Sequence, residues 1–149
     1  MPAYFLDSSA LVKRYVNEPG TPVMLVLFGG PYRLVVSQLA RVEVISALAR
    51  RGRTVVIGEE QWDAVVSALA TDFHESLEVV ELGGGVMSRA ADLARVHALK
   101  AGDAIQLACA LTARSGASPE TVLTVVSADR ELNSAAQREG LETLDPTES

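Results

Sequence analysis

The sequence predicts an α/β domain in which a mainly parallel central sheet of about five strands is covered by helices on both faces. Short apolar or β-branched runs alternate along the chain with segments whose apolar residues recur at helical spacing. At least one helical segment separates each pair of successive strands, which is the connection that parallel strands require. Together these two patterns favour a sheet between two layers of helices.

Length and composition indicate a single globular domain over residues 1–149, with a polar tail from about residue 145. Apolar residues make up 48% of the chain and charged residues 21%. No apolar stretch approaches the roughly 20 residues that cross a bilayer, so no contact with a membrane is expected. The single Cys109 excludes an internal disulfide and a CxxC zinc site, which makes the cytoplasm the expected compartment.

The net charge of −6 argues against a protein that coats nucleic acid through bulk positive charge. It remains compatible with a local site where a metal ion screens phosphate groups.

The first half of the chain is expected to hold two strands, at 3–6 and 32–37, and three helices, at 8–16, 37–51 and 58–75. The run at 3–6 is continuously apolar, as in strands buried on both faces. The sequence NEPG ends the helix that follows, because Pro19 and Gly20 do not continue a helix. Ser37 suits the N-cap of the next helix and Gly52 its end.

The second half is expected to hold strands at 77–82, 121–127 and 141–144 and helices at 86–99, 103–116 and 128–140. Three glycines at 83–85 interrupt the chain after the first of these strands. The run at 121–127 is the most β-branched of the chain and therefore suits an inner strand. Gly140 ends the last helix, and the strand at 141–144 is expected at an edge.

Four carboxylates stand at the ends or on the apolar faces of these elements: Asp7, Glu43, Asp103 and Asp129. Taken singly, Asp7, Asp103 and Asp129 suit helix caps or first-turn acids, and Glu43 suits a boundary residue paired with an arginine. In a parallel sheet, however, loops that follow strands open on the same edge. Asp7 and Asp129 therefore converge if their strands are neighbours, and the helix with Glu43 leaves from that edge.

Three or four carboxylates held together without a counter-charge repel one another and raise their own pKa values. A divalent cation supplies the missing charge. Oxygen ligands without a nearby His or Cys favour Mg²⁺ or Mn²⁺ over zinc.

The stretches FLDSSALVKRY, ARVEVISAL, LKAGDAIQLA and VVSADRELNSAA resemble the successive motifs of PIN-domain ribonucleases, and most of all the VapC-type toxins of toxin–antitoxin pairs. The resemblance extends from about residue 3 to 144, and GDAIQLA with SADREL is its most specific part. It implies the three-layer PIN fold, with Asp7, Glu43, Asp103 and Asp129 as an acidic quartet around one or two Mg²⁺ or Mn²⁺ ions. Ser127 and Ser8 would support this site.

The implied reaction is hydrolysis of an RNA phosphodiester by water, without a covalent intermediate on the protein. The implied partners are RNA, a small antitoxin and a second copy of the chain. Possible RNA contacts are Lys13, Arg14, Lys100 and Arg130, although such charges are most often plain surface. An apolar helical face could meet the antitoxin or belong to the core; its residues are Trp62, Val65, Val66 and Leu69.

Two other interpretations remain open from the residues alone. An aspartyl-phosphate phosphatase also begins with an Asp at a strand end, but it needs a second Asp where this chain has Ser9. A non-catalytic protein-binding domain would use the same acids as helix caps.

Overall fold

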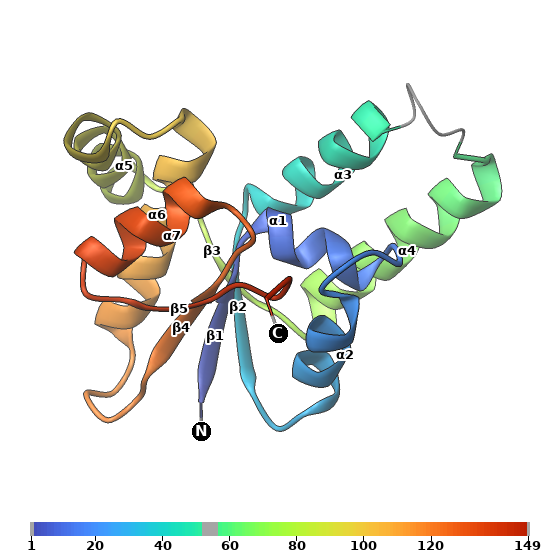
Figure 1. The fold of residues 1–149 in the computed structure, drawn as a ribbon, viewed down its shortest axis with the longest axis horizontal. Coiled ribbons are helices and arrows are strands. Elements are labelled where there is room, and N and C mark those ends of the chain that lie inside the picture. Colours follow the sequence, from blue (N-terminus) through green and yellow to red (C-terminus); the bar gives the residue numbers. More distant parts are fainter. Residues whose placement is uncertain (1, 52–56, 149) are drawn as a thin grey trace.

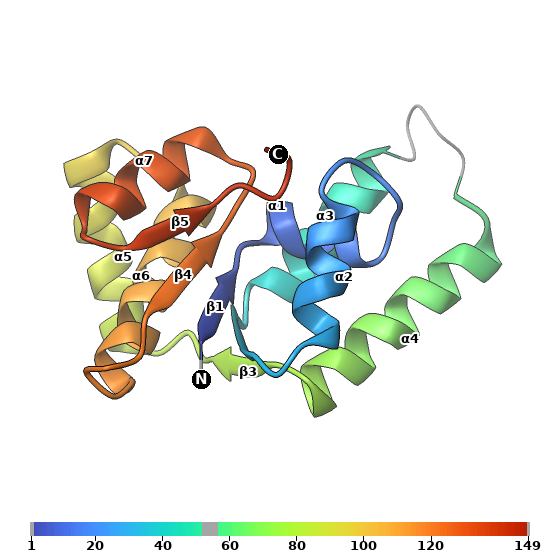
Figure 2. The ribbon, with the colours of Figure 1, turned by 60° about the horizontal axis from the view of Figure 1, so that its bottom comes forward.

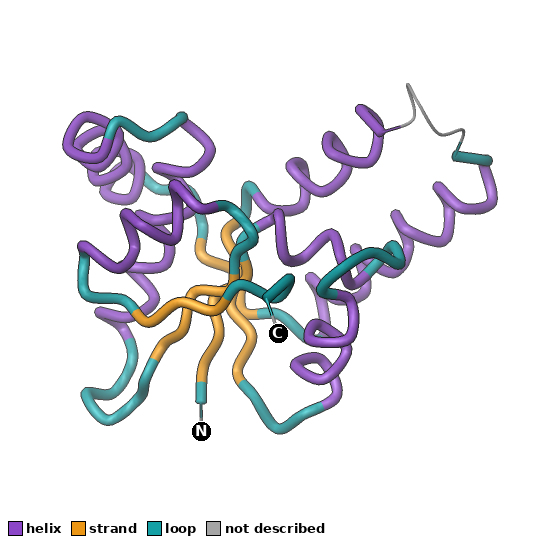
Figure 3. The backbone as a smooth tube through the Cα atoms, viewed as in Figure 1, coloured by secondary structure: helices purple, strands orange, loops and turns teal. Residues whose placement is uncertain are grey.

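The computed structural model describes residues 2–51 and 57–148, and within them the chain forms one five-stranded sheet. The strands are β1 (Ala3–Leu6), β2 (Arg33–Ser37), β3 (Glu78–Val80), β4 (Leu123–Val126) and β5 (Glu142–Leu144). Their order is β3-β2-β1-β4-β5 and every neighbouring pair is parallel, which confirms the predicted sheet (Figures 1 and 3). β1 is therefore the central strand, and β5 lies at an edge as predicted.

Helices cover both faces of this sheet (Figure 2). They are α1 (Ser8–Leu11), the 3₁₀ turn η1 (Val12–Arg14), α2 (Thr21–Gly29), α3 (Ala40–Arg51), α4 (Glu59–Glu75), α5 (Gly84–His97), α6 (Ala101–Gly116) and α7 (Arg130–Arg138). Successive strand residues point to opposite layers. Phe5 packs in a core with α5, α6 and α7, whereas Leu6 packs in a second core with α1 to α4. The predicted three-layer arrangement is thus confirmed.

Helix α2 is absent from the sequence-based prediction. Its apolar residues surround the whole helix, so no polar face produces the helical period by which such segments are recognised. On this helix Met24 and Leu27 are buried, while Leu25 and Val26 are exposed to solvent.

Several element boundaries differ from those predicted. The helix expected at 8–16 is one turn of α-helix followed by the 3₁₀ turn η1. Ser37 remains in β2, where its hydroxyl accepts the Leu39 N–H, and α3 begins only at Ala40. Helix α5 begins inside the glycine run, at Gly84. The predicted stop at Gly52 lies outside the described residues.

Side-chain bonds fix α4 to the turn after α1. The Tyr15 hydroxyl donates to Oδ2 of Asp72 at 2.6 Å, and Nε of Arg14 lies 3.4 Å from the same oxygen. Asp72 is buried, and the Arg14 guanidinium also stacks over the Phe28 ring at 4.4 Å. These contacts join η1, α2 and α4 into one layer.

Among the described residues, no helix combines the length and apolar character needed to span a membrane.

Candidate active site

The four predicted carboxylates line one pocket of about 500 Å³ at the carboxyl edge of the sheet. Asp7 follows β1 and Asp129 follows β4, and these two strands are neighbours in the sheet. Glu43 lies in the first turn of α3, and Asp103 lies in the first turn of α6. The sheet topology therefore brings together residues that are far apart in the chain, as the sequence predicted.

Asp7 is both a helix cap and part of the pocket wall. Its side chain is the N-cap of α1 and accepts the Ser9 N–H. Oδ2 also accepts two hydroxyl bonds, from Ser9 Oγ at 2.6 Å and from Ser127 Oγ at 2.9 Å. Burial raises the pKa of Asp7, because the charged form is poorly solvated, and these hydrogen bonds partly oppose that effect. The carboxylate is thus held in one orientation.

Ser9 and Ser127 connect the segments that follow the neighbouring strands β1 and β4. Ser9 Oγ accepts the Ala128 N–H at 3.0 Å, and Ser127 Oγ accepts the Asp129 N–H at 3.0 Å. Ser127 therefore lies where the sequence predicted a supporting hydroxyl. Ser8, the other predicted supporting residue, lines the pocket and lies close enough to both acids to lower the pKa of Glu43 through its side chain and that of Asp7 through its backbone. Ser9 was not predicted to support the site; its position two residues after an N-cap Asp is the available signal.

Glu43 reaches from α3 toward the start of α6. Its Oε1 accepts a hydrogen bond of 2.5 Å from the side-chain amide of Gln106, a residue that the sequence analysis did not identify. Burial raises the pKa of Glu43 and the charge of Asp7 adds to this, while the bonds from Gln106 and Ser8 lower it.

The pKa of Asp103 depends on the other acids of the pocket. Its pKa is raised to about 7, first by burial and then by the negative charges of Asp129, Asp7 and Glu43; Lys100 opposes the shift. Asp129 caps α7, because its Oδ1 accepts the Leu132 N–H at 3.0 Å. Both Asp7 and Asp129 therefore serve as caps within an acidic pocket.

The predicted RNA contacts occupy different surroundings. Lys13 lines the pocket but is buried, with its ammonium group 3.0 Å from Oε1 of Glu18. Arg14 belongs to the contacts with Asp72 and Phe28 and does not line the pocket. Lys100 precedes α6 close enough to act on Asp103, and Arg130 lines a separate polar pocket. Contact of these residues with RNA stays a prediction.

The donor set of the pocket fits Mg²⁺ or Mn²⁺. Within residues 2–51 and 57–148, none of the four carboxylates belongs to an ion pair, and no His or Cys lines the pocket. The same part of the chain contains no preformed group of three His, Cys, Asp or Glu ligands. Mutual repulsion keeps like charges apart, and Mg²⁺ commonly takes one or two carboxylates with water in its other positions.

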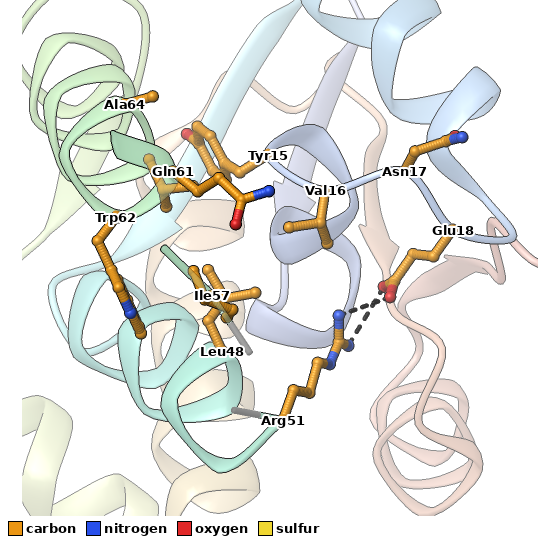
Figure 4. Close-up of a pocket in the computed structure, with 11 residues that line it drawn as sticks. Tyr15, Val16, Asn17, Glu18, Leu48, Arg51, Ile57, Gln61, Trp62 and Ala64 are labelled. Atoms are coloured by element: carbon orange, nitrogen blue, oxygen red, sulfur yellow. Dashed lines mark hydrogen bonds and ion pairs between the residues drawn. The ribbon is translucent and has the colours of Figure 1, made fainter. Parts of the chain in front are cut away.

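A second pocket of about 630 Å³ lies between residues 15–18, α3 and α4 (Figure 4), and it shares Arg51 with the acidic pocket. Its wall is largely apolar and includes Leu48, Ile57, Trp62 and Val65. At one end Arg51 forms an ion pair of 2.6 Å with Glu18, the same carboxylate that binds Lys13. Of the apolar face predicted on α4, Leu69 belongs to the core, Trp62 and Val65 line this pocket, and Val66 is exposed.

Comparison with known proteins identifies a family from the sequence and finds the same fold among solved structures. The PIN domain model matches residues 4–138. Ribonuclease VapC45 of Mycobacterium tuberculosis is 33% identical over 147 residues, which cover 94% of this chain and 93% of the relative.

Two solved structures share the fold. PAE2754 from Pyrobaculum aerophilum superposes with a TM-score of 0.66 at 19% identity, covering 95% of this chain and 90% of that protein. A chain of a toxin–antitoxin complex from Klebsiella pneumoniae has a TM-score of 0.66 at 18% identity, covering 98% and 99%. The family match over most of the sequence, together with the VapC relative and the common fold, shows that this chain belongs to the PIN-domain family, in its VapC-type group.

Proposed function

We propose that this protein is an endoribonuclease toxin that hydrolyses RNA phosphodiester bonds with the help of Mg²⁺ or Mn²⁺. The observation that carries the proposal is the convergence of Asp7, Glu43, Asp103 and Asp129 in one pocket without an ion-pair partner among the described residues. A relative that is 33% identical over nearly its whole length is named a ribonuclease, which supports the same activity.

Each part of the pocket has a role in this reaction. A bound divalent ion would make a water molecule more acidic and offset the charge that develops on the phosphate. Asp7, Glu43 and Asp103 would hold the ion directly or through water, and one of the carboxylates would accept the proton of the attacking water. Ser9 and Ser127 hold the Asp7 carboxylate in place, so its position does not have to be established during the reaction.

The substitutions Asp7→Asn and Asp103→Asn test this proposal, because each removes one charge and preserves the shape of the side chain. We expect RNA cleavage in the presence of Mn²⁺ to be lost in both variants and absent from the wild type when chelator is added. Asp63→Asn is a matched control, since Asp63 is exposed on α4 and lies outside the pocket. If Asp7→Asn cleaves RNA as fast as the wild type, the assigned site is wrong.

We further propose that a small antitoxin neutralises the protein and that the toxin forms a homodimer. Similar chains have been solved in a toxin–antitoxin complex from Klebsiella pneumoniae and in VapBC-1 from nontypeable Haemophilus influenzae. The apolar pocket beside Trp62 and Val65 (Figure 4) offers a surface for such a partner, and it shares Arg51 with the acidic pocket. An arginine or lysine of the antitoxin could enter the acidic site and take the place of the ion.

Co-expression with the small open reading frame expected just upstream tests the antitoxin proposal. We expect a stable complex that does not cleave RNA, and we expect Val65→Asp to weaken it, because a charge would be placed on an apolar contact surface. Light scattering of the purified toxin measures whether it is a dimer. Finding neither such a neighbour nor binding would indicate a nuclease that acts alone.

A further inference from the structure

Two residues of α6 enclose the carboxylate of Glu43. The amide Nε2 of Gln106 donates to Oε1, and a Cβ atom placed on Gly102 would lie only 2.7 Å from Oε2. Residues 102 and 106 are four positions apart, so they lie on the same face of the helix, one turn from each other. Glu43 itself comes from α3, and its carboxylate therefore crosses between two helices to reach this face.

Packing alone does not explain why a glutamine is buried here. Gln106 is 1% exposed, and its Oε1 has no hydrogen-bond partner among the described residues. A buried acceptor without a partner destabilises the folded state, whereas Met fills a similar volume without that penalty. A buried glutamine is expected at this position if its amide N–H is needed to hold Glu43.

The glycine at position 102 also indicates that α6 accommodates the Glu43 carboxylate. A glycine inside a helix is less favourable than alanine, and the backbone at 102 does not have the positive φ that would favour glycine. The nearest atom that a side chain at this position would meet is Oε2 of Glu43. Gly102 therefore leaves the space in which this oxygen lies.

We propose that Gly102 and Gln106 are positioning residues that form a seat for Glu43 and fix it as a ligand for the divalent cation. This inference rests on the proposed metal-dependent function. Gln106 holds one carboxylate oxygen, Gly102 leaves room for the other, and Asp103 stands between them in the sequence at the start of the same helix. The seat thus places Glu43 and Asp103 together at one helix end.

Titration with Mn²⁺ alone, followed by calorimetry, tests the seat in the variants Gly102→Ala and Gln106→Met. We expect Mn²⁺ to bind about tenfold more weakly or worse in each, since partners that orient metal ligands typically contribute 10- to 100-fold in affinity. Melting curves of both variants establish the temperatures at which they are folded, and the Mn²⁺ affinities are compared there. Cleavage should fall at limiting Mn²⁺, recover at high Mn²⁺, and keep an unchanged KM for RNA.

Leu111→Val serves as the control, because Leu111 is buried in α6 away from the pocket. It should lower the melting temperature and leave Mn²⁺ affinity unchanged. If Gly102→Ala and Gln106→Met bind Mn²⁺ as tightly as the wild type does, these two residues do not position Glu43 for the ion, and the proposed function is unaffected. If the wild type neither binds Mn²⁺ nor cleaves RNA, the proposed function fails and the seat fails with it. Should Gln106→Met not fold, the Mn²⁺ affinity of Gly102→Ala decides.

Discussion

Asp7 is a capping carboxylate that also lines the candidate active site. Capping and metal binding are rival explanations of this residue when only the sequence is considered. In the structure, Asp7 is the N-cap of α1 and also lines the acidic pocket. Asp129 likewise is the N-cap of α7 and lines the same pocket. Loss of stability in Asp7→Ala would therefore not exclude a catalytic role, since a lost cap by itself costs about 1 kcal/mol. Activity separates the two roles, and Asn is the more informative replacement.

Ser127→Ala is expected to lower RNA cleavage by about 10- to 100-fold, the usual range for residues that orient a metal ligand. The substitution removes the 2.9 Å bond to Asp7 and leaves the Asp129 N–H without its acceptor. Rates measured at saturating Mn²⁺, with Ser134→Ala as the control on the exposed side of α7, check this expectation. A wild-type rate in Ser127→Ala would mean that Ser9 alone is sufficient to orient Asp7.

At the scale of elements, the sequence predicts what local patterns determine. Strands β1 and β4 follow from continuous apolar or β-branched runs, and their ends identify Asp7 and Asp129. Helix α2 has apolar residues on all sides and therefore no period to detect. The bond between Gln106 and Glu43 joins residues 63 positions apart, and that between Ser9 and Ala128 joins residues 119 apart. Such partners depend on how α3, α6 and the loops meet in space, which no local pattern records.

Tyr15→Phe is expected to destabilise the layer formed by η1, α2 and α4 without affecting the site. It removes the hydroxyl that donates to the buried Asp72, and a hydrogen bond to a charged group typically contributes about 1.5–3 kcal/mol. For a chain of this length each kcal/mol corresponds to a change of roughly 2–4 °C in Tm. Thermal melting and RNA cleavage measured together check the prediction, and a fall in kcat at temperatures where the variant is folded would contradict it.

At the scale of the whole molecule, the proposed binding of a metal ion in the acidic pocket would also affect stability. The chain already carries a net charge of −6, and four carboxylates lie at one edge of the sheet. An ion that binds only the folded state stabilises it by RT ln(1 + [L]/Kd), or about 2.7 kcal/mol at a hundred times Kd. Mn²⁺ is therefore expected to raise the Tm of the wild type and to raise that of Asp7→Asn by less. An equal rise in both proteins would place the ion elsewhere.

The pH dependence of stability in the metal-free protein provides a test that needs no RNA. The folded pKa of Asp103 is raised from 3.8 to about 7, so the fold favours the protonated carboxyl group. This contribution to stability is fully present below the unfolded pKa and is lost as the pH rises through the folded value. Asp103→Asn stays neutral at every pH, and it therefore removes the charge that burial and the acids Asp129, Asp7 and Glu43 disfavour. Between pH 4 and 7 the Tm of the wild type should therefore fall relative to that of Asp103→Asn, and Mn²⁺ should reverse the difference near neutral pH. If the difference in Tm between the two proteins stays constant across this range, the pKa of Asp103 is not raised in the folded protein.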